Sequence, residues 1–227
     1  GMLTAAQVML EDLVSFVEHL FLPAGYRVVV CGHSLGAGTA SIFGALLRER
    51  LPPLREPGAL AVYAFACPAV YSYASALASA PFITSIINNT DVIPRASVAN
   101  VEILAAFLQR YDEALQAAGF NVGSTLTLAK LMMRNSDAEP IMPAEEIFTM
   151  LADTQRSVEL SDALHLYVPG RCVIMCERED SGGTVSCVTA DAAHPMLRIF
   201  ELDVKLLADH LAIPYRENLK RALEGLS

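Results

Sequence analysis

Residues 28–38 read VVVCGHSLGAG, and this stretch decides the fold of the chain. A run of β-branched residues enters it, a Gly-x-Ser-x-Gly turn stands at its centre, and a run rich in small residues leaves it. This order predicts a strand, a sharp turn and a helix, the context that holds a serine nucleophile on a strained turn. Gly32 and Gly36 supply positions without a Cβ, where neighbouring segments are expected to come close. Ser34 would stand above the carboxyl edge of a parallel sheet, where the first N–H groups of the helix favour an oxyanion.

The Gly-x-Ser-x-Gly pattern also has a simpler interpretation, a glycine-rich turn without chemistry. With average usage of Gly and Ser, the pattern arises by chance in about one chain in ten of this length. Here it lies between a strand-like run at residues 28–30 and a helix-like run at residues 39–47. That placement favours the catalytic interpretation.

The composition indicates one domain with a substantial core, or one large part of a bigger domain. Of the 227 residues, 53% are hydrophobic and 18% are charged, and no apolar run reaches the length of a membrane span. The net charge of −9 and the lack of any basic run argue against a nucleic-acid partner, since phosphate binding needs clustered Lys and Arg.

The five cysteines favour neither a disulfide framework nor a metal centre. Their number is odd, and Cys172 and Cys176 lack the second pair of ligands that a zinc site needs. We therefore expect reduced, buried thiols and no metal, and an intracellular or membrane-associated protein rather than a secreted one. No phosphate loop, dinucleotide fingerprint or calcium loop is present, so no cofactor is expected.

The rest of the sequence alternates between strand-like and helix-like segments, which predicts an α/β fold with a mostly parallel sheet covered by helices on both faces. We expect strands at residues 27–31, 60–66, 82–88, 164–168, 171–177 and 184–189, with a hairpin turn at 179–183, and helices at 5–21, 35–50, 71–80 and 213–226.

Residues 97–157 differ from this pattern and are expected to be a helical insertion before the last strands of a single domain spanning residues 1–227. The insertion is apolar, which suits an acyl-chain pocket or a lid, although Leu and Met at helical spacing more often simply pack. The residues considered are Phe107, Leu126, Leu128, Leu131, Met132 and Met133.

A nucleophilic serine needs a base, and the base needs an orienting carboxylate. In chain order these partners are expected after the serine, on loops at the carboxyl ends of strands. Asp91 directly follows a predicted strand and is the candidate acid, with a turn Asp that bonds its own backbone as the alternative.

Five histidines compete for the role of base. His19 precedes the nucleophile, and His165 falls in a predicted strand as a core residue. His33 lies in the turn itself and is expected to pack beside the serine at the substrate-binding surface. His210, in a late loop before the last helix, is favoured over His194.

Four motifs together resemble the class 3 lipases of the α/β-hydrolase fold. They are residues 32–38 (GHSLGAG), 64–68 (AFACP), 89–95 (NTDVIPR) and 209–215 (DHLAIPY). Residues 166–171 (LYVPGR) and the helical insertion are similar to the sn-1-specific diacylglycerol lipase branch.

The resemblance implies a lipid ester substrate, an acyl-enzyme mechanism and contact with a membrane surface. It makes Ser34 the nucleophile, Asp91 the orienting acid and His210 the base, with the N–H of Leu35 as an oxyanion donor.

The sequence departs from this family at one point. The family builds a second oxyanion donor on a loop that precedes the helix at residues 5–21, and that loop and its strands are absent. One such donor contributes about two to three orders of magnitude in rate. The departure predicts that residues 27–31 form an apolar sheet edge. It also predicts that the chain is the carboxyl-terminal portion of a larger lipase and lacks the N-terminal part of the lipase domain. A catalytically silent binding or regulatory module is therefore the alternative function, and a peptidase or thioesterase on the same fold is a third.

Overall fold

The computed structural model describes residues 1–117, 142–158, 165–178, 184–198 and 205–225. Its centre is a five-stranded sheet in the order β1-β2-β3-β4-β5. The strands are β1 (Val28–His33), β2 (Leu60–Phe65), β3 (Ile83–Asn88), β4 (Arg171–Arg178) and β5 (Thr184–Ala190). The first four are parallel, and β5 pairs antiparallel with β4. The mostly parallel sheet predicted from the sequence is therefore present, with β1 as an outer strand of the described sheet.

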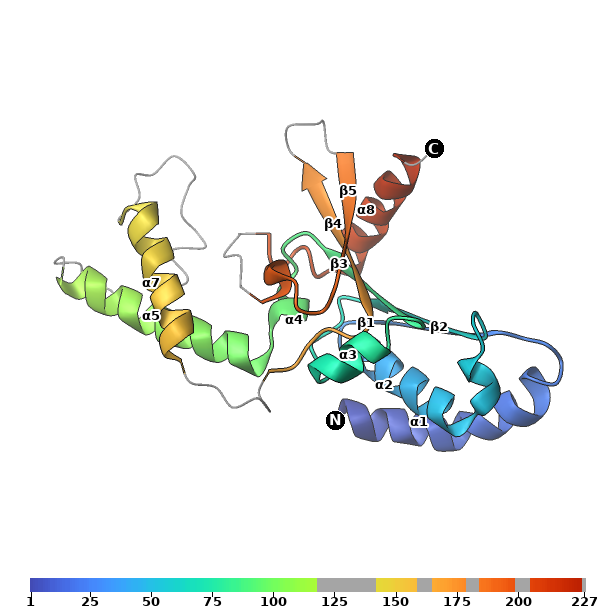
Figure 1. The fold of residues 1–227 in the computed structure, drawn as a ribbon. Coiled ribbons are helices and arrows are strands. Elements are labelled where there is room, and N and C mark those ends of the chain that lie inside the picture. The colour runs from blue at the N-terminus through green and yellow to red at the C-terminus, as the bar shows by residue number, and fades with distance from the viewer. Residues whose placement is uncertain (118–141, 159–164, 179–183, 199–204, 226–227) are drawn as a thin grey trace.

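Helices cover the two faces of the sheet unequally, as Figure 1 shows. On one face α2 packs against β1 and β2, and α1 packs on α2; on the other, α8 packs against β3, β4 and β5. The elements outside the sheet are α1 (Met2–Phe16), the π-helical turn η1 (Val17–Phe21), α2 (Leu35–Arg50), the 3₁₀ turn η2 (Pro52–Arg55), α3 (Tyr73–Ala78), α4 (Val92–Arg95), α5 (Val98–Ala117), α7 (Ala144–Ser157), the 3₁₀ turn η5 (Pro195–Leu197) and α8 (Ala212–Glu224).

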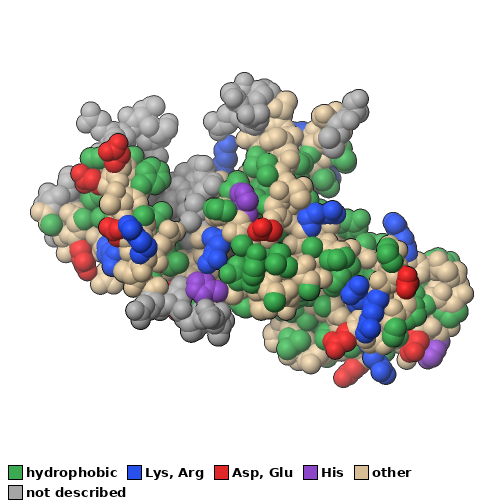
Figure 2. All heavy atoms as spheres, viewed as in Figure 1, with side chains coloured by type: hydrophobic (Ala, Val, Ile, Leu, Met, Phe, Trp, Pro, Cys, Tyr) green, Lys and Arg blue, Asp and Glu red, His purple; other side chains and the backbone are tan. Residues whose placement is uncertain are grey.

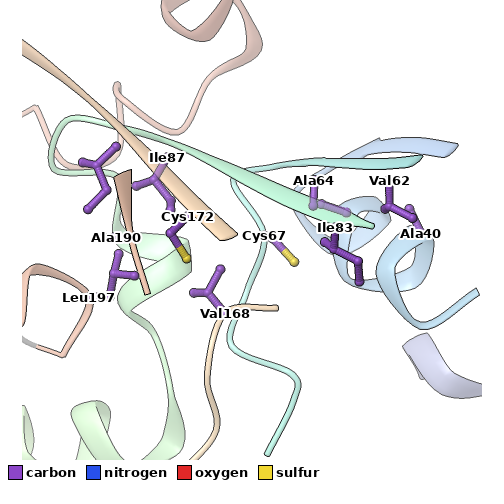
Figure 3. Packing of buried hydrophobic residues seen from close by; sticks show 12 residues of the cluster. Ala40, Val62, Ala64, Cys67, Ile83, Ile87, Val168, Cys172, Ala190 and Leu197 are labelled. Atoms are coloured by element: carbon purple, nitrogen blue, oxygen red, sulfur yellow. The ribbon is translucent and has the colours of Figure 1, made fainter. Parts of the chain in front are cut away.

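The largest apolar cluster fills the space between the sheet and α2. Figure 3 shows Val62 and Ala64 of β2 and Ile83 of β3 close to Ala40 of α2. The cluster continues across the sheet to Cys172, Ala190 and Leu197. Alternate residues of the strands supply it because side chains in a strand point to opposite faces.

The helical insertion packs on itself rather than on the sheet. Phe107, Tyr111 and Leu115 of α5 form an apolar cluster with residues of α7, and Arg110 donates hydrogen bonds to the hydroxyls of Thr154 and Ser157. In Figure 1 the two helices extend away from the sheet. Phe107 therefore packs within the insertion, and the other apolar residues singled out there, together with the predicted turn at 179–183, lie outside the described residues.

The strand predicted at residues 164–168 is wrong. In the described part, 165–168, a single isolated bridge pairs Tyr167 with Tyr71, and His165 is not in a strand. The segment crosses from the insertion to β4, and its backbone bonds the loop after β2 rather than a neighbouring strand.

The face of the molecule that is drawn in Figure 2 is mixed in character. Figure 2 shows acidic and basic side chains intermingled with hydrophobic ones on the face in view. Among the described residues, no helix has the combination of length and apolar character needed to cross a bilayer.

Candidate active site

Ser34 lies on the sharp turn between β1 and α2. Its φ of 59° and ψ of −129° lie in a sparsely populated region for a residue with a Cβ, which marks a strained position. Its N–H donates to the carbonyl of Phe65 at the end of β2, which fixes the turn to the sheet. The structure thus places the hydroxyl at the carboxyl end of the parallel strands, where the sequence predicted it.

Only one of the two glycines predicted to avoid crowding does so. A Cβ on Gly32 would overlap the backbone of Gly36 and Ala37, so this position lets α2 start directly against β1. A Cβ on Gly36 would meet no atom within 4 Å, so the expectation of crowding there is wrong. The difference arises because Gly32 lies near the end of β1 against the first turn of α2, whereas Gly36 lies within α2 with open space at its Cβ position.

Asp91 follows β3 and caps the short helix α4. Its side chain is fully buried, and Oδ1 accepts a hydrogen bond of 2.9 Å from the N–H of Ile93. Oδ2 accepts one of 2.6 Å from the hydroxyl of Tyr215. The alternative interpretation, a turn Asp bonded to its own backbone, is thus also part of the structure, but the same carboxylate reaches His210.

His210 lies between this carboxylate and the serine. Its Nδ1 is 3.1 Å from Asp91 Oδ1, and its Nε2 is 3.0 Å from Ser34 Oγ. A carboxylate only accepts hydrogen bonds, so Nδ1 of the neutral ring carries the proton. Nε2 then presents a lone pair to the serine hydroxyl, the arrangement that allows it to take the hydroxyl proton.

The first turn of α2 lies beside the hydroxyl. The N–H groups of Ala37 and Gly38 bond the carbonyl of Ser34, whereas those of Leu35 and Gly36 come before the first intrahelical bonds. Leu35 N–H directly follows the nucleophile, as an oxyanion donor in this position must.

His33 faces the base rather than open solvent. Its Nε2 lies 2.9 Å from the carbonyl oxygen of His210, to which it must donate, and the two rings are 5.0 Å apart. The substrate-binding role predicted for His33 remains a prediction.

The other histidines lie elsewhere. His194 Nδ1 accepts from the N–H of Met196 in η5, and His165 bonds Arg198. His19 is near Glu18 on η1. Of the two candidate bases weighed from the sequence, the structure brings His210 to Ser34.

Two residues of the site were not assigned a role from the sequence, although both lie in the quoted motifs. Tyr215 donates to Asp91 and accepts from the N–H of Asn88, and burial, together with the charge of Asp91, raises the pKa of its hydroxyl well above the usual value. Arg95 is fully buried and donates to the carbonyls of Asp91, Asn89 and Met196. Only the position of each within its motif could have signalled these contacts.

The described residues contain no group of three or more His, Cys, Asp or Glu side chains that could hold a metal ion. Burial raises the pKa of Cys67 and of Cys172 to about 12, so both are held as neutral thiols in the core.

Comparisons with known proteins find lipases among the similar sequences and structures. The family model described as Lipase (class 3) matches residues 1–101. Human diacylglycerol lipase-alpha is 25% identical over 216 residues, which are 88% of this chain and 19% of that protein. Mouse diacylglycerol lipase-beta is 40% identical over 85 residues, 35% of this chain and 11% of that protein. The chain therefore spans about a fifth or less of the length of these relatives.

A solved structure shares the fold. The lipase from Rhizopus microsporus var. chinensis superposes with a TM-score of 0.52 at 17% identity, covering 93% of this chain and 52% of that one. The α/β-hydrolase fold expected from the sequence is confirmed. Over residues 1–101 the chain is similar to the class 3 lipases, and over most of its length it is similar to the diacylglycerol lipases.

Proposed function

We propose that this chain carries the catalytic site of a serine-dependent lipid ester hydrolase that acts on acylglycerols through an acyl-enzyme. The observation that carries the proposal is the position of His210, with Ser34 Oγ at 3.0 Å on one ring nitrogen and Asp91 Oδ1 at 3.1 Å on the other. The similarity to proteins named diacylglycerol lipases supports diacylglycerol as the substrate.

Acylation begins when His210 Nε2 takes the hydroxyl proton of Ser34 as Oγ attacks the ester carbonyl carbon. The oxyanion that develops lies next to the N–H of Leu35 and the start of α2, whose dipole stabilises negative charge. Asp91 stabilises the imidazolium. Collapse of the tetrahedral intermediate breaks the bond to the alcohol oxygen, which leaves with the proton of His210. The acyl group stays on Ser34.

Deacylation repeats these steps with water. His210 Nε2 takes a proton from the water as its oxygen attacks the acyl-enzyme, and the same groups stabilise the second oxyanion. Oγ then leaves as it regains the proton from His210, and the fatty acid is released.

The surroundings of the serine and the base support an apolar substrate. Exposed aliphatic side chains directly follow both residues, Leu35 after Ser34 and Leu211 after His210. Leu207 and Ile213 are also more than half exposed on either side of the base. Such side chains suit acyl chains and a lipid surface, and we propose membrane-surface contact at this edge.

We further propose one hydrolase domain in which residues 97–157 are the insertion. The separate apolar cluster between α5 and α7 supports this division.

Labelling with a fluorophosphonate and hydrolysis of a short-chain p-nitrophenyl ester test the proposal. Ser34→Ala and His210→Gln should each abolish both, a loss of about four orders of magnitude or more. His194→Asn, which keeps a capping side chain on η5, is the matched control and should retain both. Folded wild-type protein that is neither labelled nor active would contradict catalysis by this chain and favour the silent-module alternative.

A further inference from the structure

We propose that Asp209 is a positioning residue that fixes His210 within reach of both Ser34 and Asp91. The inference rests on the proposed function, since it concerns the base of that site. Asp209 immediately precedes the base, yet its side chain turns away from solvent and is 6% exposed. A buried carboxylate is costly unless its oxygens are hydrogen-bonded.

Each oxygen of this carboxylate has a partner on the loop that follows β3. Oδ1 accepts from Asn89 Nδ2 at 3.2 Å. Oδ2 accepts from the N–H of Thr90 at 3.2 Å and from its hydroxyl at 2.8 Å. These partners directly precede Asp91 in the chain. Asp209 therefore ties the segment that carries the base to the segment that carries the acid.

The loop that receives Asp209 is itself strained and anchored. Asn89 has a φ of 39°, in the left-handed region that residues with a Cβ rarely adopt. Its Oδ1 accepts from the N–H of Glu177 in β4, while its Nδ2 donates to Asp209. The oxygen of this amide thus bonds the sheet, and its nitrogen bonds the segment that carries His210.

The backbone around the base is fixed by two further contacts. Asn88 Nδ2 donates to the carbonyl of Asp209 at 3.1 Å, and His33 Nε2 donates to the carbonyl of His210 at 2.9 Å. Since His210 lies in a turn before α8 and not in a strand, side-chain contacts replace a sheet ladder in setting its position.

Asp209→Asn is the sharpest perturbation because it conserves shape. All groups facing the carboxylate are donors, so either orientation of an amide would set its NH₂ against another donor. Asp191→Asn is the matched control. Asp191 Oδ1 accepts from the N–H of Ala193 in an exposed turn, remote from the chemistry proposed for the site.

The first readout does not depend on activity. In ¹⁵N–¹H spectra of the imidazole groups of the folded, full chain, the Nδ1–H of His210 should give a slowly exchanging signal that disappears in His210→Gln. Asp209→Asn should broaden or lose that signal, and Asp191→Asn should keep it.

The second readout is the rate constant for labelling of Ser34 by a fluorophosphonate, with kcat and KM for a short-chain ester. Asp209→Asn should lower the labelling rate constant and kcat by about ten- to a hundredfold with KM unchanged, since small misplacements of a catalytic group cost this much. Thr90→Val, which removes one of the three donors, should act in the same direction with a smaller effect.

A stability loss in Asp209→Asn with the ring signal and labelling rate unchanged would overturn the proposal, because Asp209 would then be structural only. Absence of the protected signal in the wild type would overturn it as well. In a third outcome, the wild-type protein shows the protected signal, the Asp209→Asn variant loses it, and neither protein is labelled by the fluorophosphonate. This outcome would support the positioning role and contradict the proposed hydrolase function.

Discussion

The two halves of the sheet differ in how completely they are covered. Strands β3, β4 and β5 lie between an apolar cluster on one face and α8 on the other. Among the described residues, α2 covers strands β1 and β2 on one face only, and Val29, Cys31 and Tyr63 are exposed on the opposite face.

An apolar groove of about 640 Å³ between α1 and β1 adds to this bare region. The comparison teaches that Ser34 lies on the turn between β1 and α2, the helix that covers one face of β1, while the opposite face of that strand is open among the described residues. Asp91 and His210, the proposed acid and base, lie on the more fully covered half.

The largest difference between the halves should appear in thiol reactivity. Cys31 is exposed on the bare face, whereas Cys172 is buried in β4 with its pKa raised to about 12 by burial. Alkylation of Cys172 requires opening of the core, so Cys31 should react faster by about three orders of magnitude or more. Peptide mapping after timed iodoacetamide labelling measures both rates. Similar rates in the folded protein would mean that the two halves are equally open, and protein unfolded in urea gives the reference.

Next in size is the effect of adding a Cβ where α2 meets β1. Gly32→Ala should lower the free energy of unfolding by about 3 kcal/mol or prevent folding, because the new methyl group would meet backbone that cannot move away. Gly36→Ala has open space and should be neutral or slightly stabilising, since Ala favours helix over Gly. Urea titrations of both variants test this. Equal losses would contradict the described contact between the turn and the strand.

A smaller difference is expected between two valines on the two faces of the bare half. Val62 of β2 is 1% exposed beneath α2, and Val29 of β1 is 48% exposed on the opposite face. Val62→Ala should cost about 2 kcal/mol and Val29→Ala less than about 0.5 kcal/mol. Thermal unfolding of both variants and of the wild-type protein measures these losses of stability. A large loss in Val29→Ala would indicate that something covers this face in solution.

The smallest effect concerns alkaline stability. Burial raises the pKa of Cys67 and Cys172 in the folded state from a reference of 9.0 to about 12. A group whose folded-state pKa is raised holds its proton more tightly when folded, so its stabilisation is present below the unfolded pKa and declines above it. Two such thiols should lower stability by roughly 0.7 kcal/mol between about pH 8 and 9. Urea titrations at several pH values measure how the free energy of unfolding changes with pH. This pH dependence should be weaker in a Cys67→Ala, Cys172→Ala double variant, and an unchanged pH dependence would contradict the raised pKa of the two thiols.

Local sequence rules predicted most of the fold. The run of β-branched residues before Ser34 and the small residues after it gave β1 and α2, and α2 has the predicted limits of Leu35–Arg50. The strand expected at residues 164–168 failed because an apolar, aromatic run predicts burial but not a pairing partner, and Tyr167 pairs with a loop.

The site was only partly accessible from the sequence. Ser34, Asp91 and His210 could be named because each follows a strand or loop in a known order. Tyr215 bonds the Asp91 carboxylate across 124 positions, and Arg95 bonds the carbonyl of Asp91. Asp209 bonds Thr90, the residue before Asp91, across 119 positions. No spacing rule encodes these contacts.

The separation between Ser34 and His210 has a consequence for synthesis of the chain. Ser34 and His210 are 176 positions apart in the chain, and His210 comes shortly before α8, the last described helix. During translation the strained turn can form early, but its serine has no base until nearly all of the described chain has left the ribosome. A nascent chain that stalls before that point would carry the strained turn and Ser34 without the imidazole that we propose activates it.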